Sequence, residues 1–302
     1  MKVLITDHIH QEGIKLLRNS GFSVDEKYDL SKDDLKKIIG NYEALIVRSK
    51  TKVTREVIEA GNKLLVIGRA GVGLDNIDVN AAKEKNIKVI NTPDVSTVSV
   101  AELVMGFMIS AARFIPQATE SLKKGEWEKE KFMGMELSGK TLGIVGLGRI
   151  GKALAKRAMA FDMTVIGYDP YVKSDENIKM VDLETLLKNS DFISFHVPLT
   201  DETKHMISSK EIEKMKKGVI LINAARGGIL DEIAIKKGMD EGIIKAVCLD
   251  VFESEKPFNT ILTSEENFIG TPHIGAQTEE AQQRAGIEIS KKIIEFLKGI
   301  KG

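Results

Sequence analysis

Cysteine and tryptophan are almost absent from this chain, with one residue of each among 302. Because Cys248 has no second cysteine to pair with, a disulfide framework within the chain is excluded. Cys248 lies in the apolar run 246–249. We therefore expect a buried thiol that packs in a core and takes no part in redox chemistry.

The chain also lacks a net charge and any long hydrophobic run. Lys plus Arg and Asp plus Glu both number 44, so the formal net charge is zero and no basic excess points to nucleic acid or to a membrane surface. No apolar stretch reaches about 18 residues, which argues against a membrane span. The N-terminus enters a strand-like run without a signal-peptide pattern, so we expect a cytoplasmic protein.

Strand-like and helix-like patterns alternate along the sequence instead. The first part has short apolar runs at 3–6, 22–25, 44–47, 64–69 and 88–91, separated by amphipathic segments at 11–19, 33–39, 55–60 and 78–85. This alternation predicts a parallel sheet covered by helices on both faces. A long helical pattern follows, and Ser99 with Glu102 predicts a capping box at its start.

A glycine fingerprint, Gly146-x-Gly148-x-x-Gly151, lies in the middle of the chain. It follows an apolar strand, precedes a helical pattern, and the next strand ends at Asp169. The three glycines permit a tight turn, close approach of a pyrophosphate and close packing of helix on strand. The helix N-terminus offers N–H groups to the phosphates. Because Asp169 would bind the ribose hydroxyls and repel a 2′-phosphate, the pattern predicts NAD over NADP.

The position of this fingerprint predicts that another domain precedes it. Further strands are expected at 141–146, 163–168, 191–196, 218–223, 245–249 and 267–270, followed by a helical segment at 279–297. The last helix has no strand after it, so we expect it to pack on the first domain. We predict an α/β fold with two doubly wound domains: a discontinuous substrate domain, 1–92 and 280–302, and a Rossmann NAD domain, 93–279. A cleft between two such domains is a favoured ligand position.

Polar residues at predicted strand ends are candidates for chemistry. Arg226 precedes two glycines, and its planar guanidinium suits a carboxylate with an adjacent carbonyl; the alternative is a solvated loop arginine. His273 is our candidate general acid and base, with His196 as its rival. Glu255 would orient the His273 ring, although Glu253 competes for that function on sequence alone.

The other histidines and one further acid are assigned by their place in the chain. His8 and His10 lie at the end of the first strand, outside the fingerprint domain. His205 lies in a polar segment and is expected at the surface. Asp250, at a strand terminus, is expected on the nicotinamide side of the ligand.

With these residues the chain resembles the D-isomer-specific 2-hydroxyacid dehydrogenases. The resemblance covers essentially the whole chain and is carried by residues 45–54, 67–76, 91–93, 99–102, 127–134, 142–151, 223–228, 249–252 and 271–275. Within the family the chain is most similar to the branch that oxidises D-3-phosphoglycerate, and from the resemblance we expect a short form without a C-terminal regulatory domain. Two departures stand out: Val72 replaces a common threonine, and Lys256 separates Glu255 from Pro257.

The resemblance implies an activity. It is the NAD-dependent oxidation of D-3-phosphoglycerate to 3-phosphohydroxypyruvate, a step of serine biosynthesis. Reduction of hydroxypyruvate or glyoxylate is the alternative, and an NAD(H)-sensing binding protein is a third candidate from another class. The intact set of Arg226, Glu255 and His273 argues against a sensor.

The resemblance also implies functions for single residues. Arg226 would bind the substrate carboxylate, His273 would take the hydroxyl proton, and Glu255 would pair with His273. The implied cofactor contacts are Gly146, Gly148, Arg149, Ile150, Gly151, Asp169, Val197, Ala224, Asp250, Gly275 and Ala276. The implied substrate contacts are Arg48 and Ser49 for the phosphate and Gly71, Val72 and Gly73 for the carboxylate. No metal site is expected. The helix from Ser99 and the arm at 127–132 would form a homodimer interface.

Overall fold

The computed structural model describes residues 1–255 and 258–300, which divide into two compact units. The first unit comprises Met1–Ser96 and the chain from Ala276 on, and the second comprises Thr97–Gly275. Each unit is built on its own parallel sheet with helices on both faces. The α/β fold class predicted from the sequence is therefore confirmed.

The first unit has a five-stranded sheet in the order β2-β1-β3-β4-β5. This is the order of flavodoxin-like sheets. Its strands are β1 (Lys2–Ile5), β2 (Ser23–Glu26), β3 (Ala44–Val47), β4 (Val66–Arg69) and β5 (Lys88–Asn91). Its helices are α1 (Gln11–Asn19), α2 (Lys32–Ile38), the 3₁₀ turn η1 (Ile39–Asn41), α3 (Arg55–Ala60), α4 (Val79–Glu84) and α11 (Glu279–Gly299).

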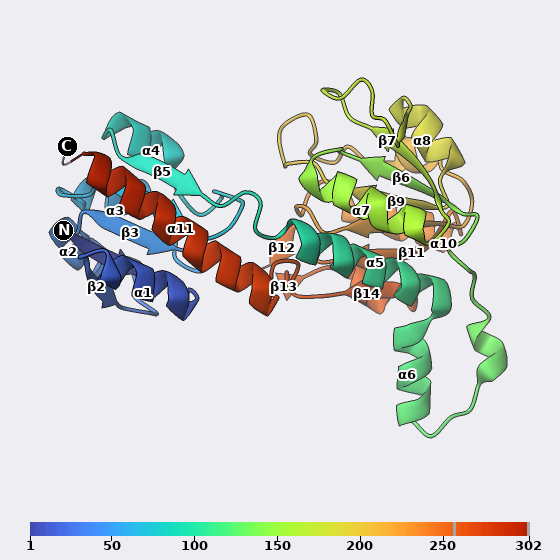
Figure 1. Cartoon of the computed structure of the whole chain (residues 1–302). Coiled ribbons are helices and arrows are strands. Elements are labelled where there is room, and N and C mark those ends of the chain that lie inside the picture. The colour runs from blue at the N-terminus through green and yellow to red at the C-terminus, as the bar shows by residue number, and fades with distance from the viewer. Residues whose placement is uncertain (256–257, 301–302) are drawn as a thin grey trace. The chain divides into compact units, whose positions relative to one another are not determined.

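Alternate strand residues of this sheet fill two separate cores. Leu4 and Leu45 pack in the core beneath α2, α3 and α4, whereas Ile5 and Ile46 pack in the core beneath α1 and α11. Helix α11 contacts α1, β4 and β5, as expected for a last helix with no strand after it (Figure 1). A Cβ on Gly13 of α1 would overlap the backbone of α11, so this close helix contact requires glycine.

The second unit has a seven-stranded sheet in the order β14-β11-β10-β9-β6-β7-β8, with every pair of neighbours parallel. The strands are β6 (Thr141–Val145), β7 (Thr164–Tyr168), β8 (Lys179–Met180), β9 (Phe192–Phe195), β10 (Val219–Asn223), β11 (Ile244–Leu249) and β14 (Phe268–Gly270). The strand order reverses between β6 and β9, which is the switch point where Rossmann-like sheets bind ligands.

Helices cover both faces of this second sheet. They are α5 (Thr97–Arg113), α6 (Ile115–Lys123), α7 (Arg149–Ala160), α8 (Leu183–Asn189), α9 (Ser209–Ile212) and α10 (Glu232–Asp240), with 3₁₀ turns η2 (Lys129–Phe132) and η3 (Ile261–Ser264). Helices α5 and α7 share one core with Ile144 and Ile222. Helices α8, α9 and α10 share the other with Val145 and Leu221. Cys248 is fully buried in the first of these cores, and burial raises the pKa of its thiol.

The predicted strands lie within two residues of the observed ones, but other predictions need correction. The capping box is wrong, because α5 begins at Thr97 and Ser99 is a buried residue inside the helix. The sequence pattern does not predict helix α6, because only Ser121 of this helix is buried and its apolar Ile115 and Leu122 face no core. Strand β8 and the hairpin of β12 (Ser254–Glu255) and β13 (Phe258–Asn259) are too short to leave a periodic signal.

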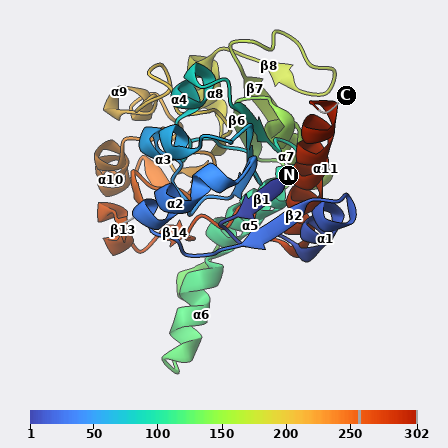
Figure 2. The ribbon, with the colours of Figure 1, turned by 90° about the vertical axis from the view of Figure 1, so that its left-hand side faces the viewer.

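Helix α6 extends away from the second sheet in both ribbon views (Figures 1 and 2). It is separated from α5 by Phe114, whose backbone is left-handed with φ 55°. Among the described residues, no single helix combines the length and apolar character that a membrane crossing requires. Only α5 and α6 together pass that test, as a pair bent by 63°.

Candidate active site

The predicted site residues of the second unit gather at one edge of its sheet. Gly146 follows β6, Asp169 follows β7, Val197 follows β9, Ala224 follows β10 and Asp250 follows β11. Because all these strands are parallel, their carboxyl ends lie on the same side. This edge, centred on the switch point between β6 and β9, is where an open α/β sheet binds ligands.

The glycine turn between β6 and α7 leaves room for an anion. Gly146 has φ +96°, and a Cβ there would lie 2.6 Å from the carbonyl oxygen of His196. Gly148 is the N-cap of α7 and has no side chain to occupy the N–H groups of the first turn. Among the described residues, nothing lies within 4 Å of the position that a Cβ on Gly148 would take. The turn therefore fits the pyrophosphate of a dinucleotide.

Asp169 is fixed beside this turn by backbone hydrogen bonds. Its Oδ2 accepts from the N–H of Leu147 at 2.8 Å, and its Oδ1 accepts from the N–H of Tyr171 at 2.8 Å. Each carboxylate oxygen has a second lone pair, so Asp169 can still accept from ribose hydroxyls. The turn and the acid together fit NAD.

Arg226 lies on a braced turn after β10. The side chain of Asn223 donates to the Arg226 carbonyl at 2.8 Å and accepts from the Ala225 N–H at 3.0 Å. A Cβ on the next residue, Gly227, would overlap the carbonyl oxygen of Phe252. The turn that carries Arg226 therefore packs directly on the backbone that leads to β12.

His273 and Glu255 form a hydrogen-bonded pair at the same edge. His273 Nδ1 lies 2.9 Å from Glu255 Oε1, and the two side chains are 49% and 41% exposed. Glu253 pairs instead with His205, whose Nε2 lies 3.0 Å from Glu253 Oε1. Of the two acids that compete on sequence alone, the structure thus brings Glu255 to His273. Lys256 and Pro257, which mark the departure from the family pattern, lie outside the described residues.

Asp250 holds the turn on which His273 lies. Its carboxylate accepts from Thr271 Oγ1 at 2.6 Å and from the N–H groups of Ile274 and Gly275 at 2.7 and 2.8 Å. The residue is 1% exposed, and burial raises the pKa of its carboxyl group. His273 itself has a left-handed backbone, φ 54°, and the bonds to Asp250 stabilise this uncommon conformation.

His196, the rival candidate, is in a different environment. Its Nε2 lies 2.9 Å from Ser194 Oγ, and its Nδ1 is buried without a partner among the described residues. Burial lowers the pKa of the imidazole from 6.5 to about 4, so the ring is neutral near pH 7. With no carboxylate on its second nitrogen, His196 lacks the orienting partner that His273 has.

The buried ring of His196 predicts a loss of stability in mild acid. The unfolded chain takes up a proton below about pH 6.5 and the folded chain does not, so this contribution is complete above that pH and is lost as pH falls towards 4. We expect the wild-type free energy of unfolding to fall by about 2 kcal/mol more than that of His196→Gln between about pH 7 and pH 5. Urea titrations of both proteins measure this difference, and identical pH dependence would contradict it.

The predicted substrate residues of the first unit lie on loops after β3 and β4. Asp7, which follows β1 and is 6% exposed, accepts from the Arg48 N–H at 2.6 Å and from Thr51 Oγ1 at 2.6 Å. Asn76 donates to the carbonyls of Arg48 and Thr51 at 2.7 and 2.6 Å. Ser49, between them, is exposed. Two buried or half-buried polar residues thus fix the loop of Arg48 and Ser49 on both sides.

The loop of Gly71, Val72 and Gly73 is braced in the same way. Asn91 donates to the Val72 carbonyl at 2.6 Å. Gly71 has φ +149°, a backbone conformation that side-chain-bearing residues rarely adopt, and the Arg69 guanidinium occupies the position of its missing Cβ. In the loop after β3, burial lowers the pKa of the Arg48 guanidinium, while the nearby carboxylate of Asp7 opposes this shift.

Sequence reasoning missed these bracing residues. Asp7, Asn91 and Asn223 each lie at the carboxyl end of a strand. A polar residue at a strand end marks Arg226 and His273 as candidates, and the same signal marks these three residues.

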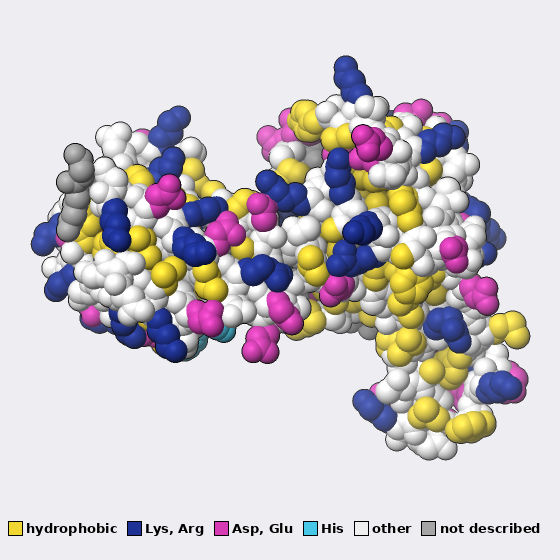
Figure 3. All heavy atoms as spheres, in the orientation of Figure 1, with side chains coloured by type: hydrophobic (Ala, Val, Ile, Leu, Met, Phe, Trp, Pro, Cys, Tyr) yellow, Lys and Arg dark blue, Asp and Glu magenta, His cyan; other side chains and the backbone are white. Residues whose placement is uncertain are grey.

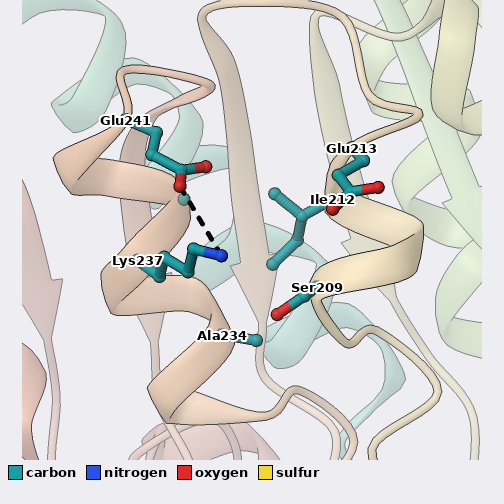
Figure 4. Close-up of a pocket in the computed structure, with 7 residues that line it drawn as sticks. Ser209, Ile212, Glu213, Ala234, Lys237 and Glu241 are labelled. Atoms are coloured by element: carbon teal, nitrogen blue, oxygen red, sulfur yellow. Dashed lines mark ion pairs between the residues drawn. The ribbon is translucent and has the colours of Figure 1, made fainter.

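Two surface hollows are lined by residues outside the candidate site. One, between α9 and α10, has a volume of about 10 Å³, enough for about one water molecule (Figure 4). Its lining includes the Lys237–Glu241 ion pair at 3.7 Å. The other, of about 320 Å³, is lined in the first unit by Asp94, Val95, Arg284, Ile287, Glu288 and Lys291. None of these residues was predicted as a ligand contact.

Comparison with known proteins agrees with the cofactor fit. Residues 105–275 match the family model described as D-isomer specific 2-hydroxyacid dehydrogenase, NAD binding domain. Among solved structures, the chain is similar to D-lactate dehydrogenase from Aquifex aeolicus complexed with NAD and lactic acid. The TM-score is 0.86 and the identity 32%, over 98% of this chain and 96% of that one.

Two relatives have different names. The chain is 52% identical to D-3-phosphoglycerate dehydrogenase of Methanocaldococcus jannaschii over 99% of its own length, but it spans only 58% of that protein. It is also 52% identical to hydroxypyruvate reductase of Thermotoga maritima, over 98% of each chain. With the matching domain model, these identities show that the chain belongs to the D-isomer specific 2-hydroxyacid dehydrogenase family.

Proposed function

We propose that this chain is an NAD-dependent dehydrogenase that oxidises D-3-phosphoglycerate to 3-phosphohydroxypyruvate, as in serine biosynthesis. The observation that carries the proposal is the His273–Glu255 pair, 2.9 Å between Nδ1 and Oε1, at the edge of the sheet that also holds the NAD-binding glycine turn. A carboxylate on one ring nitrogen orients the other towards a substrate hydroxyl. A protein that only senses NAD(H) has no need of such a pair.

The side chains have separate tasks in this reaction. NAD, when bound, supplies the hydride acceptor. Arg226 binds the substrate carboxylate with its planar guanidinium and polarises the reacting oxygen. His273 Nε2 removes the hydroxyl proton as hydride leaves C2 and returns it in the reverse direction. Glu255 accepts from Nδ1 and stabilises the imidazolium that forms.

We propose a substrate-binding function for the discontinuous domain, 1–92 and 280–302, and an NAD-binding function for 93–279. Arg48 and Ser49 would bind the phosphate, and the backbone N–H groups from Gly71 to Gly73 would bind the carboxylate. The braced loops support this assignment, because a phosphate clamp must be held in place before the ligand arrives.

Arg48 also distinguishes this proposal from its alternative. Reduction of hydroxypyruvate or glyoxylate is supported by the identity to the Thermotoga maritima enzyme. We expect Arg48→Ala to raise KM for D-3-phosphoglycerate about 10- to 100-fold, because a charge-assisted contact worth about 1.5–3 kcal/mol is lost. KM for glyoxylate should change less than threefold. Steady-state kinetics on both substrates test this, and equal losses would favour the alternative.

We further propose that the chain forms a homodimer through α5 and the arm that follows α6. The last turn of α6 exposes Leu122 at 58%, and the chain after α6 exposes Trp127 and Met133 at 84% and 83%. Figure 3 shows apolar side chains in this part of the molecule. Exposed apolar clusters of this kind are typical of protein interfaces. We expect sedimentation velocity to give a dimer for the wild type and a larger monomer fraction for Trp127→Ser. A wild-type monomer would contradict the proposal.

A substrate panel tests the activity itself. D-3-phosphoglycerate, D-glycerate and D-lactate would be assayed with NAD and with NADP, and hydroxypyruvate and glyoxylate with the reduced cofactors, by absorbance at 340 nm. We expect the highest kcat/KM for D-3-phosphoglycerate with NAD. Preference for an unphosphorylated acid would favour the alternative, and no turnover at all would favour a sensor.

A further inference from the structure

A second histidine–carboxylate pair lies beside the proposed catalytic pair. His205 Nε2 is 3.0 Å from Glu253 Oε1, and the two side chains are 39% and 40% exposed. His205 has a left-handed backbone, φ 49°, and its N–H donates to the carbonyl of Gly228 at 2.7 Å. The loop after β9 therefore reaches both the turn that carries Arg226 and the segment that leads to Glu255.

The segment before Glu255 is held at three points. The Glu253 side chain pairs with His205, and the Glu253 N–H donates to Glu232 Oε1, at the start of α10, at 3.0 Å. The third point is the backbone of Phe252, on which Gly227 packs so closely that a Cβ would overlap it. His205, Gly228, Gly227 and Glu253 thus form a closed ring of contacts between three loops.

Glu255 follows this ring of contacts closely in the chain. It lies two residues after Glu253, in the two-residue strand β12, which pairs only with the equally short β13 among the described residues. So short a hairpin is not stable by itself. A histidine–carboxylate pair as exposed as His205–Glu253 adds little to global stability, so its main effect is on local geometry.

We propose that His205 is a positioning residue for the proposed oxidation of D-3-phosphoglycerate, and this inference rests on that proposed function. Through Glu253 it holds the segment that brings Glu255 to His273. Through the carbonyl of Gly228 it ties that segment to the turn of Arg226. His205 therefore couples the group that binds the substrate carboxylate to the pair that moves the proton.

Two variants remove the pair from either side, His205→Asn and Glu253→Ala. Asparagine tolerates the left-handed backbone of His205 but is too short to keep the contact. We expect each variant to lower kcat for D-3-phosphoglycerate about tenfold with KM for NAD unchanged, and the double variant to lose no more than either alone. In a Glu255→Gln background, His205→Asn should cost no further activity, because it acts through Glu255.

Lys216→Gln is the matched control. It breaks another partly exposed ion pair, Lys216–Asp191 at 2.6 Å, at the opposite end of the same sheet. We expect wild-type kcat for this variant. The inference is overturned if His205→Asn retains kcat within twofold of the wild type. It is also overturned if the loss of kcat in the double variant with Glu255→Gln equals the product of the losses in the two single variants.

A spectroscopic measurement separates this inference from the proposed function. With ¹⁵N-labelled histidine, the ring resonances of His273 should shift in His205→Asn and in Glu253→Ala but not in Lys216→Gln. Unchanged His273 resonances would overturn the inference. A wild-type protein that turns over no hydroxy acid would instead refute the proposed function, while the His273 resonances would still decide whether His205 positions the pair.

Discussion

The His273→Asn variant is expected to lose about a thousandfold in kcat for D-3-phosphoglycerate. A positioned general acid or base contributes about 10²- to 10⁴-fold, and asparagine cannot take up the proton. Asparagine is chosen because it tolerates the left-handed backbone of His273, φ 54°, so the turn held by Asp250 is retained. NADH formation at 340 nm under saturating substrate and NAD measures the loss.

His10→Asn is the control for this prediction. His10 is the N-cap of α1 in the first unit, a position where asparagine is among the preferred residues. We expect it to retain wild-type kcat. If His273→Asn kept a tenth or more of the wild-type kcat, His273 would not be the acid and base. His196 would then have to be tested despite the low pKa of its buried ring.

The second large effect is expected for Arg226→Gln. A guanidinium that binds a carboxylate through two charge-assisted hydrogen bonds contributes about 1.5–3 kcal/mol for each. Their loss corresponds to about 10²- to 10⁴-fold in kcat/KM. Glutamine keeps much of the side-chain length, and the bracing bonds from Asn223 involve the backbone of the turn, so the turn should persist. Steady-state kinetics with D-3-phosphoglycerate measure the effect.

The matched control is Arg55→Gln. Arg55 also forms a two-pronged contact, with Glu84 at 2.6 and 3.0 Å, but on an exposed surface of the first unit. Exposed pairs contribute little, so kcat/KM should stay at the wild-type value. A loss for Arg226→Gln of less than fivefold would mean that Arg226 is the solvated loop arginine that its sequence context also allows.

The sequence predicts the framework of both sheets because their strands are buried on both faces and leave uninterrupted apolar runs. Leu142 and Ile144 face one core and Val145 the other, so β6 has no polar residue after Thr141. Because these apolar runs end at Gly146 and Asp169, the sequence also places both residues at strand ends, where the glycine turn and the carboxylate fit NAD. Strand ends also locate Arg226 and His273.

Contacts between loops could not be predicted from the residue pattern. The residue pattern alone leaves Glu255 and Glu253 open as partners of His273, and only the family resemblance implies Glu255. The hairpin of two-residue strands that carries Glu255 has no periodic signal. His205 is a surface residue by its sequence context, and only the fold brings it to Glu253. Helix α6 is missed for a related reason, because its apolar residues Ile115 and Leu122 are exposed and face no core within the chain.

The most direct test of the central claim follows the hydrogen at C2 of the substrate. D-3-phosphoglycerate deuterated at C2 would be incubated with the protein and NAD, and the reduced cofactor analysed by mass spectrometry. We predict that the deuterium appears on the nicotinamide ring with the wild type, and that transfer falls about a thousandfold in His273→Asn. Absence of transfer from this and every other D-2-hydroxy acid tested would contradict the account.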